Sequence, residues 1–310
     1  MAIRVFVDGA EGTTGLKIDE RLRGRRDVEV LSIDPALRKD ARARRALLHA
    51  ADVAFLCLPD DAARESAALA EGSDAIVLDA STAHRVSPGW AYGFPELSPA
   101  HRAAIASAGR IAVPGCHATG FLAIVYPLVA LGILPRDYPL AATSLSGYSG
   151  AGKKAIAQYE AADRPAALDS PRLYALSQAH KHLPEMTAVA DLLAPPVFQP
   201  VICDFYAGMA ISVPLNASRL GAPATPDSLF DALTGYYAGQ PMISVSRAPG
   251  DGFLPANLLA GDNRLTIYVC GNDERIVLTS LLDNLGKGAS GAAMQCMNVA
   301  LGLPEQTGLL

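Results

Sequence analysis

The first residues of the chain predict a strand, a glycine-rich turn and a helix in immediate succession, and this order limits the folds open to the chain. An apolar run at 3–7 leads to Asp8, the segment GAEGTTG follows at 9–15, and helix-forming residues continue to Leu22. Glycines in this context allow a tight turn and let a pyrophosphate approach the amino end of the helix. The spacing is GxxGxxG rather than GxGxxG, so a turn without a ligand is the alternative interpretation.

The next hundred residues alternate between apolar extended runs and helical patterns. Strands are expected at 28–33, 53–58, 75–78 and 111–113, with helices at about 38–49 and 61–70. This alternation predicts a doubly wound parallel α/β sheet, in which ligands lie beyond the carboxyl ends of the strands. The residues that follow strands, and are therefore expected along one edge, are Gly9, Pro59, Ser81 and Cys116.

The end of the second expected strand bears on the choice between NAD and NADP. An acidic residue at this position takes the ribose 2′-hydroxyl of NAD, and here the segment contains both Ser32 and Asp34. Arg38 and Lys39 follow, and a hydroxyl with two cations suits a 2′-phosphate. We therefore favour NADP, while Asp34 favours NAD. In the remaining alternative, the two cations only solvate the next helix.

After residue 116 the pattern changes to a series of extended runs. They lie at 138–145, 201–203, 210–215, 242–245, 265–270 and 276–281, and the last two flank the turn signal GNDE at 271–274. These runs predict a second domain of α+β type with a mostly antiparallel sheet. A final helix is expected at about 286–302.

Composition excludes several classes of protein. The 310 residues carry a net charge of −5, which argues against a nucleic-acid partner. A membrane partner is not expected, because no run approaches ~18 uncharged apolar residues and the amino terminus does not resemble a signal peptide. Five scattered cysteines without a CxxC pair indicate reduced thiols, so we expect a cytoplasmic protein.

The segment VPGCHATG at 113–120 places one cysteine where its thiol is expected to be reactive. Cys116 follows Pro114-Gly115 and precedes a helical run at 121–131. A thiol at a helix start lies beside unpaired backbone N–H groups and the positive end of the helix dipole, which favour the nucleophilic thiolate. The other four cysteines lie in apolar runs or the last helix and are expected to be core residues.

The segment QAHKHLPE at 178–185 offers an acid–base partner for this thiol. Leu183 precedes a proline, which disfavours helical backbone there, so a helix is expected from Pro184 to Leu193. His180 and His182 would then share one face of an extended lead-in. Polar loop histidines are the alternative. No metal is expected, because a third ligand with recognisable spacing is missing.

The segment SGYSGAGKK at 146–154 is glycine-rich and follows an expected strand. Its hydroxyls, backbone N–H groups and two lysines suit phosphate binding, although the spacing is not that of a Walker A motif. A flexible loop without a ligand is the alternative.

Seven segments in the same order resemble the N-acetyl-gamma-glutamyl-phosphate reductase family in its shorter bacterial form. They are GAEGTTG at 9–15, DASTAHR at 79–85, YGFPEL at 92–97, PGCHATG at 114–120, SGYSGAGKK at 146–154, HKHLPEM at 180–186 and DNLGKGASGAAMQCMN at 283–298. Three residues depart from the family pattern: Val113 stands where asparagine is usual, His117 where an aromatic is frequent, and Lys181 where arginine is common. His117 thereby becomes a competing candidate base. The related aspartate-semialdehyde dehydrogenases are the alternative family, acting on another acyl phosphate.

The resemblance implies NADPH-dependent reduction of N-acetyl-L-glutamyl 5-phosphate to the 5-semialdehyde and phosphate, through a Cys116 thioester with His180 as acid–base. It implies a Rossmann-like NADP-binding domain at 1–115 plus 286–310, a catalytic and dimerisation domain at 116–285, and a homo-oligomer, dimer or tetramer. Two rivals are a cysteine hydrolase that needs no nicotinamide and a nucleotide sensor without activity.

Individual residues receive roles from the same resemblance. The pyrophosphate contacts are expected from Gly9, Gly12, Thr13, Thr14 and Gly15. The 2′-phosphate contacts are expected from Ser32, Arg38 and Lys39. Further cofactor contacts are expected from Pro59, Ser81, Ser146, Gly147 and, toward the nicotinamide amide, Asn284. The substrate phosphate or carboxylate is expected to meet Arg85, Ser149, Lys181 or His182.

Overall fold

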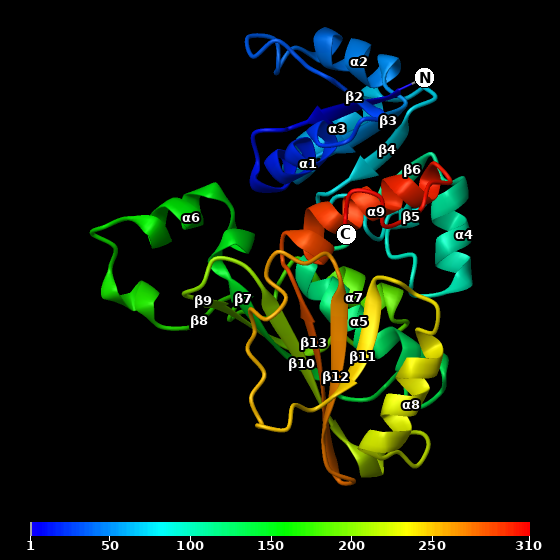
Figure 1. Cartoon of the computed structure of the whole chain (residues 1–310), viewed down its shortest axis with the longest axis vertical. Coiled ribbons are helices and arrows are strands. Elements are labelled where there is room, and N and C mark those ends of the chain that lie inside the picture. Colours follow the sequence, from blue (N-terminus) through cyan, green and yellow to red (C-terminus); the bar gives the residue numbers. More distant parts are fainter. Residues whose placement is uncertain (1) are drawn as a thin grey trace. The chain divides into compact units, whose positions relative to one another are not determined.

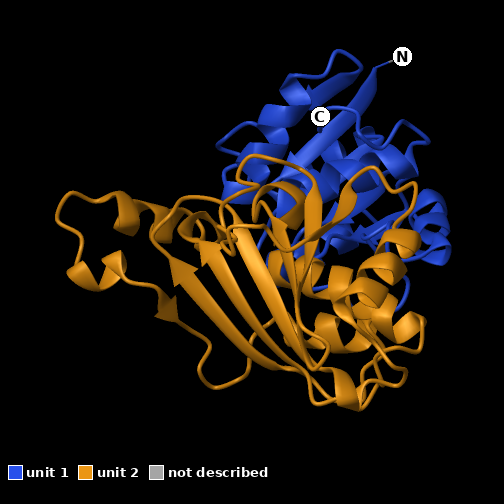
Figure 2. Cartoon of the chain, turned by 60° about the horizontal axis from the view of Figure 1, so that its bottom comes forward, with its two compact units in different colours: residues 1–114, 289–310 blue, residues 115–288 orange. Residues whose placement is uncertain are grey.

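The computed structural model describes residues 2–310, which divide into two compact units (Figure 2). Unit 1 contains the residues up to Pro114 together with 289–310, and unit 2 contains residues 115–288. The chain thus leaves unit 1 two residues before Cys116 and returns to it after Gly288. Within residues 2–310, no helix has the length and apolar character needed to cross a membrane.

Unit 1 is built on a six-stranded parallel sheet with the strand order β2-β1-β3-β4-β6-β5 (Figure 1). The strands are β1 (Ile3–Asp8), β2 (Val28–Leu31), β3 (Val53–Leu56), β4 (Ile76–Asp79), β5 (Ala91–Tyr92) and β6 (Arg110–Ala112). The helices are α1 (Thr13–Arg23), α2 (Ala41–Ala50), α3 (Asp60–Leu69), α4 (Pro99–Ser107) and α9 (Gly291–Ala300). The predicted parallel α/β sheet is confirmed.

Helices cover both faces of this sheet, which explains why its strands read as continuous apolar runs. Every residue of β3 is buried. Helices α2 and α3 contact one another and contact β1 and β3 respectively, while α1 contacts β1 and α9, and α9 contacts β4 and α4. Helices α2 and α3 pack over a core that includes Phe6, Leu48, Leu56 and Val77. A strand buried on both faces has no polar side to alternate with its apolar one.

Strand β1 lies between β2 and β3. The chain passes from β1 to β2 on one side and then crosses to β3 on the other side, so the strand order reverses at β1. In doubly wound sheets this is where a ligand crevice forms. The last residue of β1, Asp8, is buried and is bound there by Arg44 of α2 at 3.0 Å and by the Ser66 hydroxyl of α3 at 2.6 Å. These bonds fix the backbone immediately before the Gly9 turn.

Unit 2 contains a seven-stranded sheet with the order β11-β12-β13-β10-β7-β9-β8. Four of its six neighbouring strand pairs are antiparallel, which confirms the predicted mostly antiparallel sheet. The strands are β7 (Ala141–Gly147), β8 (Arg172–Leu173), β9 (Val197–Cys203), β10 (Met209–Asn216), β11 (Ile243–Arg247), β12 (Leu265–Gly271) and β13 (Arg275–Leu282). The α-helices are α5 (Cys116–Ala130), α6 (Lys153–Glu160), α7 (Leu183–Val189) and α8 (Pro226–Tyr236). The expected turn at 271–274 joins β12 to β13.

One face of this sheet packs against helices. Helix α5 contacts β10 and β13, and α8 contacts β11 and β12. Along β10, alternate residues from Met209 to Leu215 are buried, whereas Pro214 and Asn216 are exposed. Such alternation is typical of an antiparallel sheet with one covered and one open face. On other strands of the same sheet, Leu145 and Val197 are also exposed.

Two helix boundaries differ from the prediction in ways that matter for the site. Helix α5 begins at Cys116 rather than at Phe121, because Gly115 is extended and Gly120 lets the first turns approach the sheet closely. A side chain at Gly120 would collide with Ile211 and with the Ser280 hydroxyl. Close packing therefore offsets the weak helix propensity of the early turns. The expected last helix is instead a π-helical turn at Gly286–Ser290 followed by α9.

Candidate active site

Cys116 is the first residue of α5, with Gly115 as its N-cap, and its side chain is half-buried. The helix that it starts is buried almost throughout. Backbone N–H groups in the first turn have no partner within the helix, and they lie at the positive end of the dipole. A thiolate placed here is stabilised by both effects.

Two groups from distant parts of unit 2 fix the backbone around Cys116. The Glu185 carboxylate, on the buried face of α7, accepts a hydrogen bond from the Gly115 N–H at 3.2 Å. On another side, Gly288 approaches so closely that a Cβ there would lie 2.7 Å from the Cys116 Cβ. Only glycine fits at 288 without moving Cys116.

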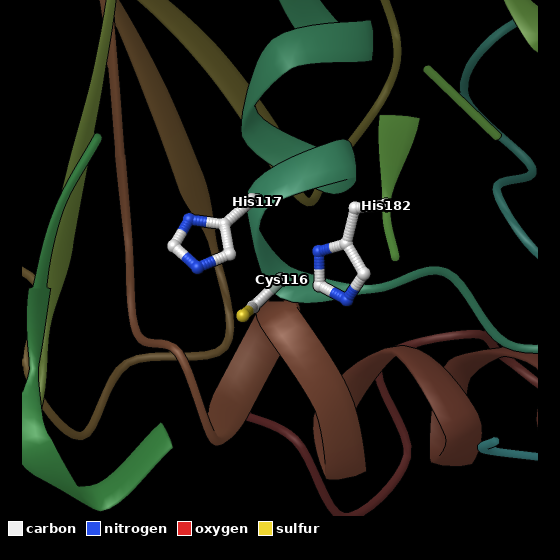
Figure 3. A group of neighbouring side chains, drawn as sticks. All are labelled: Cys116, His117 and His182. Atoms are coloured by element: carbon white, nitrogen blue, oxygen red, sulfur yellow. The ribbon is translucent and has the colours of Figure 1, made fainter. Parts of the chain in front are cut away.

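Three histidine rings converge on one another, and two of them lie beside this cysteine. The centroid of His180 lies 4.8 Å from that of His182 and 5.3 Å from that of His117, while His117 and His182 are 5.4 Å apart. His117 and His182 flank the Cys116 side chain (Figure 3). The Cys116 sulfur, one ring nitrogen of His117 and one ring nitrogen of His182 all lie within 4.8 Å of one another.

The expected extended lead-in before α7 is wrong, although the two histidines do converge. His182 has helical backbone angles and its N–H donates to the His180 Nδ1 at 3.1 Å, so a turn brings the rings together. Leu183 is helical despite the following proline, since its buried side chain and a main-chain bond to His180 hold it there. The restriction before proline is a bias that packing overcomes.

His117 is held between two hydroxyl groups. Its Nδ1 lies 2.7 Å from the Ser144 Oγ and its Nε2 lies 2.7 Å from the Tyr174 Oη. Burial, followed by the charges of His180 and Lys181, lowers the pKa of His117 to about 3. His117 is therefore a neutral imidazole near pH 7, and it is a weaker candidate than His180 for holding and delivering a proton.

Three of the other four cysteines resist the thiolate form. Burial raises the pKa of Cys57 to about 12, with smaller contributions from Asp79 and Asp8. Burial likewise raises the pKa of the Cys203 and Cys270 thiols. A raised pKa keeps these groups protonated at neutral pH, so they are poor nucleophiles.

The glycine-rich loop after β7 is ordered by Asn284. The Asn284 amide donates to the Ser149 Oγ at 2.9 Å and accepts from the Gly208 N–H at 2.8 Å. Ser146 is buried, and a side chain at Gly147 would meet the main-chain oxygen of Tyr206 at 2.6 Å. The structure thus brings the predicted residues Ser146, Gly147, Ser149 and Asn284 into one loop cluster, whereas Lys181 is exposed on the turn before α7.

The predicted nucleotide turn has the geometry that requires glycine. Gly9 has a φ of +87°, and a side chain there would collide with the main chain of Cys57. A side chain at Gly15 would collide with the main chain of Gly9 and Ala10. Gly12 caps α1, and Thr13 and Thr14 form its first turn. The compact turn leaves the amino end of α1 accessible to an anion.

A cavity of 530 Å³ lies beside this turn. Its lining includes Gly9 together with three residues predicted for the 2′-phosphate, Ser32, Arg38 and Lys39. Arg38 forms an exposed ion pair at 2.5 Å with Glu11, which also lines the cavity. An incoming phosphate can compete for this guanidinium because a surface ion pair is worth only about 0–1 kcal/mol.

The remaining predicted residues of unit 1 lie at strand ends. Pro59 caps α3 after β3. Ser81 is buried, and its hydroxyl donates to Asp79 at 2.7 Å. The Arg85 guanidinium donates to the main-chain oxygens of Val113 at 2.9 Å and Ala80 at 3.3 Å. Arg85 thus supports the segment that leads to Cys116.

Sequence reasoning gave no role to four residues that shape this site. They are Ser144, Tyr174, Glu185 and Gly288. Glu185 and Gly288 lie in segments singled out by their motifs, but neither residue type indicates which backbone it approaches. Ser144 and Tyr174 have no local signal, because their positions depend on pairing and packing with distant segments.

Comparisons with known proteins place these features in context. The chain matches the semialdehyde dehydrogenase dimerisation domain over residues 116–284 and the semialdehyde dehydrogenase NAD binding domain over residues 36–105. It is 46% identical over 318 residues to N-acetyl-gamma-glutamyl-phosphate reductase 2 of Nostoc sp., covering 99% of each chain. It is also 46% identical over 308 residues to N-acetyl-gamma-glutamyl-phosphate reductase of Rhizobium rhizogenes, covering 97% of this chain and 99% of the relative.

Solved structures share the fold at low sequence identity. Aspartate semialdehyde dehydrogenase II of Vibrio cholerae superposes with a TM-score of 0.73 at 17% identity, covering 97% of this chain and 99% of that one. Aspartate semialdehyde dehydrogenase of Candida albicans, solved with NADP, gives a TM-score of 0.68 at 16% identity, covering 96% and 98% of the two chains.

Proposed function

Because the chain belongs to the semialdehyde dehydrogenase family, as an N-acetyl-gamma-glutamyl-phosphate reductase of arginine biosynthesis, we propose that Cys116 carries the acyl group as a thioester during reduction. The observation that supports this most is the position of Cys116 at the first residue of a buried helix, between His117 and His182, whose rings both contact His180. The helix start favours the thiolate, and an imidazole can exchange a proton with the oxygen of the thiohemiacetal.

The first half of the reaction is acyl transfer. The Cys116 thiolate attacks the carbonyl carbon of the acyl phosphate, and the tetrahedral intermediate collapses with cleavage of the carbon–oxygen bond to phosphate. Backbone N–H groups in the first turn of α5 lie where the oxyanion develops on this path. Each such donor is worth roughly 3 kcal/mol in other enzymes. The products of this half are a Cys116 thioester and free phosphate.

The second half is reduction of the thioester. Bound NADPH supplies the hydride for the thioester carbonyl. His180 then gives a proton to the thiohemiacetal oxygen. When the thiohemiacetal collapses to the aldehyde, His180 takes that proton back as the carbon–sulfur bond breaks. The aldehyde leaves and the Cys116 thiolate is restored, so two electrons have passed from the dinucleotide to the acyl carbon.

The hydrogen bonds of the histidines support His180 as this acid–base group. The main-chain N–H of His182 donates to the His180 Nδ1, so Nε2 is the ring nitrogen of His180 that can exchange a proton with a substrate oxygen. His180 is half-buried, whereas His182 is 5% exposed and His117 is held neutral by burial. Of the three rings, His180 is therefore the most accessible to a substrate oxygen.

Residues of unit 1 fit a nicotinamide dinucleotide with a 2′-phosphate. The turn at Gly9 and Gly15 leaves no room for side chains, which lets a pyrophosphate approach the main chain and α1. The neighbouring cavity has Arg38 and Lys39 in its lining to meet a 2′-phosphate. We assign NADP over NAD from these two cations. The proposed cofactor contacts also include Gly12, Thr13, Thr14, Ser32, Pro59, Ser81, Ser146, Gly147 and Asn284.

The remaining assignments concern the residues that bind the substrate, the oligomer and the compartment. Arg85, Ser149, Lys181 and His182 are assigned to the phosphate or carboxylate of the substrate. The dimerisation-domain match indicates a homo-oligomer, which we assign as a dimer or tetramer formed through the open sheet face that carries Leu145 and Val197. A catalytic thiol needs reducing conditions, so the cytoplasm is the assigned compartment.

Replacing Cys116 with serine tests the thioester. The Cys116→Ser variant should bind NADPH with unchanged affinity, measured by nucleotide fluorescence, and should lose reduction of the acyl phosphate. A serine hydroxyl is similar in size but is not ionised near pH 7. The matched control is Cys270→Ser, which should keep full activity. Full turnover in Cys116→Ser would contradict the proposal.

Replacing each histidine with asparagine tests the acid–base assignment. His180→Asn should lower kcat by about 10²–10⁴, because its oxygen can still accept the His182 N–H but no group delivers the proton. His117→Asn and His182→Asn should lose less. The measurement is the steady-state rate from the aldehyde with NADP and phosphate. A larger loss in His182→Asn or His117→Asn would move the assignment to that residue.

Removing both cations from the cavity tests the preference for NADP. Arg38→Ala with Lys39→Ala should weaken NADPH binding by about 10–100-fold, the loss expected for one charge-assisted hydrogen bond, and should leave NADH binding nearly unchanged. Arg45→Ala, an exposed arginine of α2 outside the cavity lining, is the control. Equal losses for the two nucleotides, measured by titration, would reject the 2′-phosphate role.

A further inference from the structure

The donor set around the candidate nucleophile suits a metal ion as well as an acyl group. The Cys116 sulfur and one nitrogen each from His117 and His182 lie within 4.8 Å of one another. One thiolate and two imidazoles are the ligands that Zn²⁺ prefers, whereas Mg²⁺ and Ca²⁺ prefer oxygen. The sequence spacing offered only His180 and His182 as ligands, whereas the folded cluster keeps His182, leaves out His180 and adds His117 and the thiol.

We propose that Cys116, His117 and His182 form a reversible inhibitory site for Zn²⁺, in which the ion occupies the sulfur that attacks the substrate. The site has three protein ligands and leaves a fourth position for water. The proposed consequence for activity rests on the assigned role of Cys116 as the nucleophile, whereas the binding of the ion does not.

The size of the cluster is close to that of a zinc site. Bond lengths of about 2.3 Å to sulfur and 2.0–2.1 Å to nitrogen put tetrahedral ligand atoms about 3.3–3.6 Å apart. The observed limit of 4.8 Å therefore requires movements of about 1 Å toward a common centre. Small side-chain rotations of Cys116 and His182 supply such movements, and both rings already flank the cysteine (Figure 3).

The backbone that carries these ligands is held in place. Cys116 and His117 occupy the first turn of α5, and His182 is the N-cap of α7. The two helices contact one another, and the hydrogen bond from Gly115 to Glu185 joins their amino ends. Because the ligands come from two fixed helix starts, little conformational entropy is lost when an ion binds.

His117 also has the outer contact that orients a metal-binding imidazole. The Ser144 hydroxyl at its Nδ1 can remain, and the ion takes Nε2 in place of the Tyr174 hydroxyl. Tyr174 is thus a competitor for the same nitrogen as the ion, and its removal should favour the ion.

Cobalt provides a test that does not depend on activity. Co²⁺ added to the whole wild-type protein under anaerobic conditions should bind once per chain. It should give a thiolate-to-cobalt charge-transfer band together with the strong visible bands of tetrahedral coordination. Added Zn²⁺ should displace the Co²⁺ and remove both sets of bands. Absence of the charge-transfer band, or its persistence in Cys116→Ser, would overturn the proposal.

Variants then locate the nitrogen ligands. His117→Gln and His182→Gln should each weaken Zn²⁺ by more than about 100-fold in competition with a chromophoric chelator. That loss exceeds the 10–100-fold typical of outer-shell residues, which is the range expected for Ser144→Ala. Tyr174→Phe should bind Zn²⁺ as tightly as wild type or more tightly. Cys270→Ser and His49→Gln are the controls, and unchanged affinity in both histidine variants would contradict the site.

Activity measurements separate this inference from the thioester. In the wild type, Zn²⁺ should inhibit in competition with the acyl phosphate, and a chelator should restore the rate. If Cys116→Ser kept its turnover while the wild-type cobalt spectrum showed thiolate ligation, the thioester would fail and the metal site would stand. If Cys116→Ser were inactive and no cobalt band formed in the wild type, the metal site alone would fail.

Discussion

The buried first turn of α5 is the constraint on which the site depends. Its helix is packed against β10 and β13, so Cys116 cannot shift without disturbing the core of unit 2. Gly115 is held by Glu185, and Gly288 closes on the cysteine from another segment. The same backbone N–H groups that would stabilise a thiolate therefore stay fixed where the proposed oxyanion would form. A mobile loop could present a thiol, but it could not keep these donors aligned at the same time.

Buried carboxylates hold the loops around both candidate sites. Asp8 binds Arg44 and Ser66 before the glycine turn, and Asp79 accepts from Ser81 and lies 2.7 Å from the His84 Nδ1. In unit 2, Asp283 accepts from the main-chain N–H groups of Leu285 and Gly286 at 2.7 Å, just before the approach of Gly288 to Cys116. A buried charge is costly unless it is fully hydrogen-bonded, so each carboxylate enforces one conformation of its loop.

Features of the fold that depend on short stretches of sequence could be predicted from the sequence alone. The parallel sheet, the mostly antiparallel sheet and the turn at 271–274 were predictable because apolar strand runs, their alternation with helical patterns and glycine turns are local signals. The convergence of His180 and His182 was predicted for the wrong reason, since a turn and not an extended segment creates it. Ser144, Tyr174 and Glu185 were not predictable, because their hydrogen bonds to the first turn of α5 span 27, 57 and 70 residues. Such contacts depend on the tertiary fold and not on spacing.

Mass spectrometry of the acylated protein tests the role of Cys116 most directly. The wild-type protein would be mixed with N-acetyl-L-glutamyl 5-phosphate without nicotinamide nucleotide, quenched in acid and digested. A thioester intermediate requires an added N-acetylglutamyl group on the peptide that contains Cys116. Hydroxylamine should remove this group. The group should be absent when NADPH is supplied before the quench, because the thioester is then reduced. An unmodified Cys116 peptide in a sample that turns over with NADPH, or acylation at a different residue, would contradict the thioester.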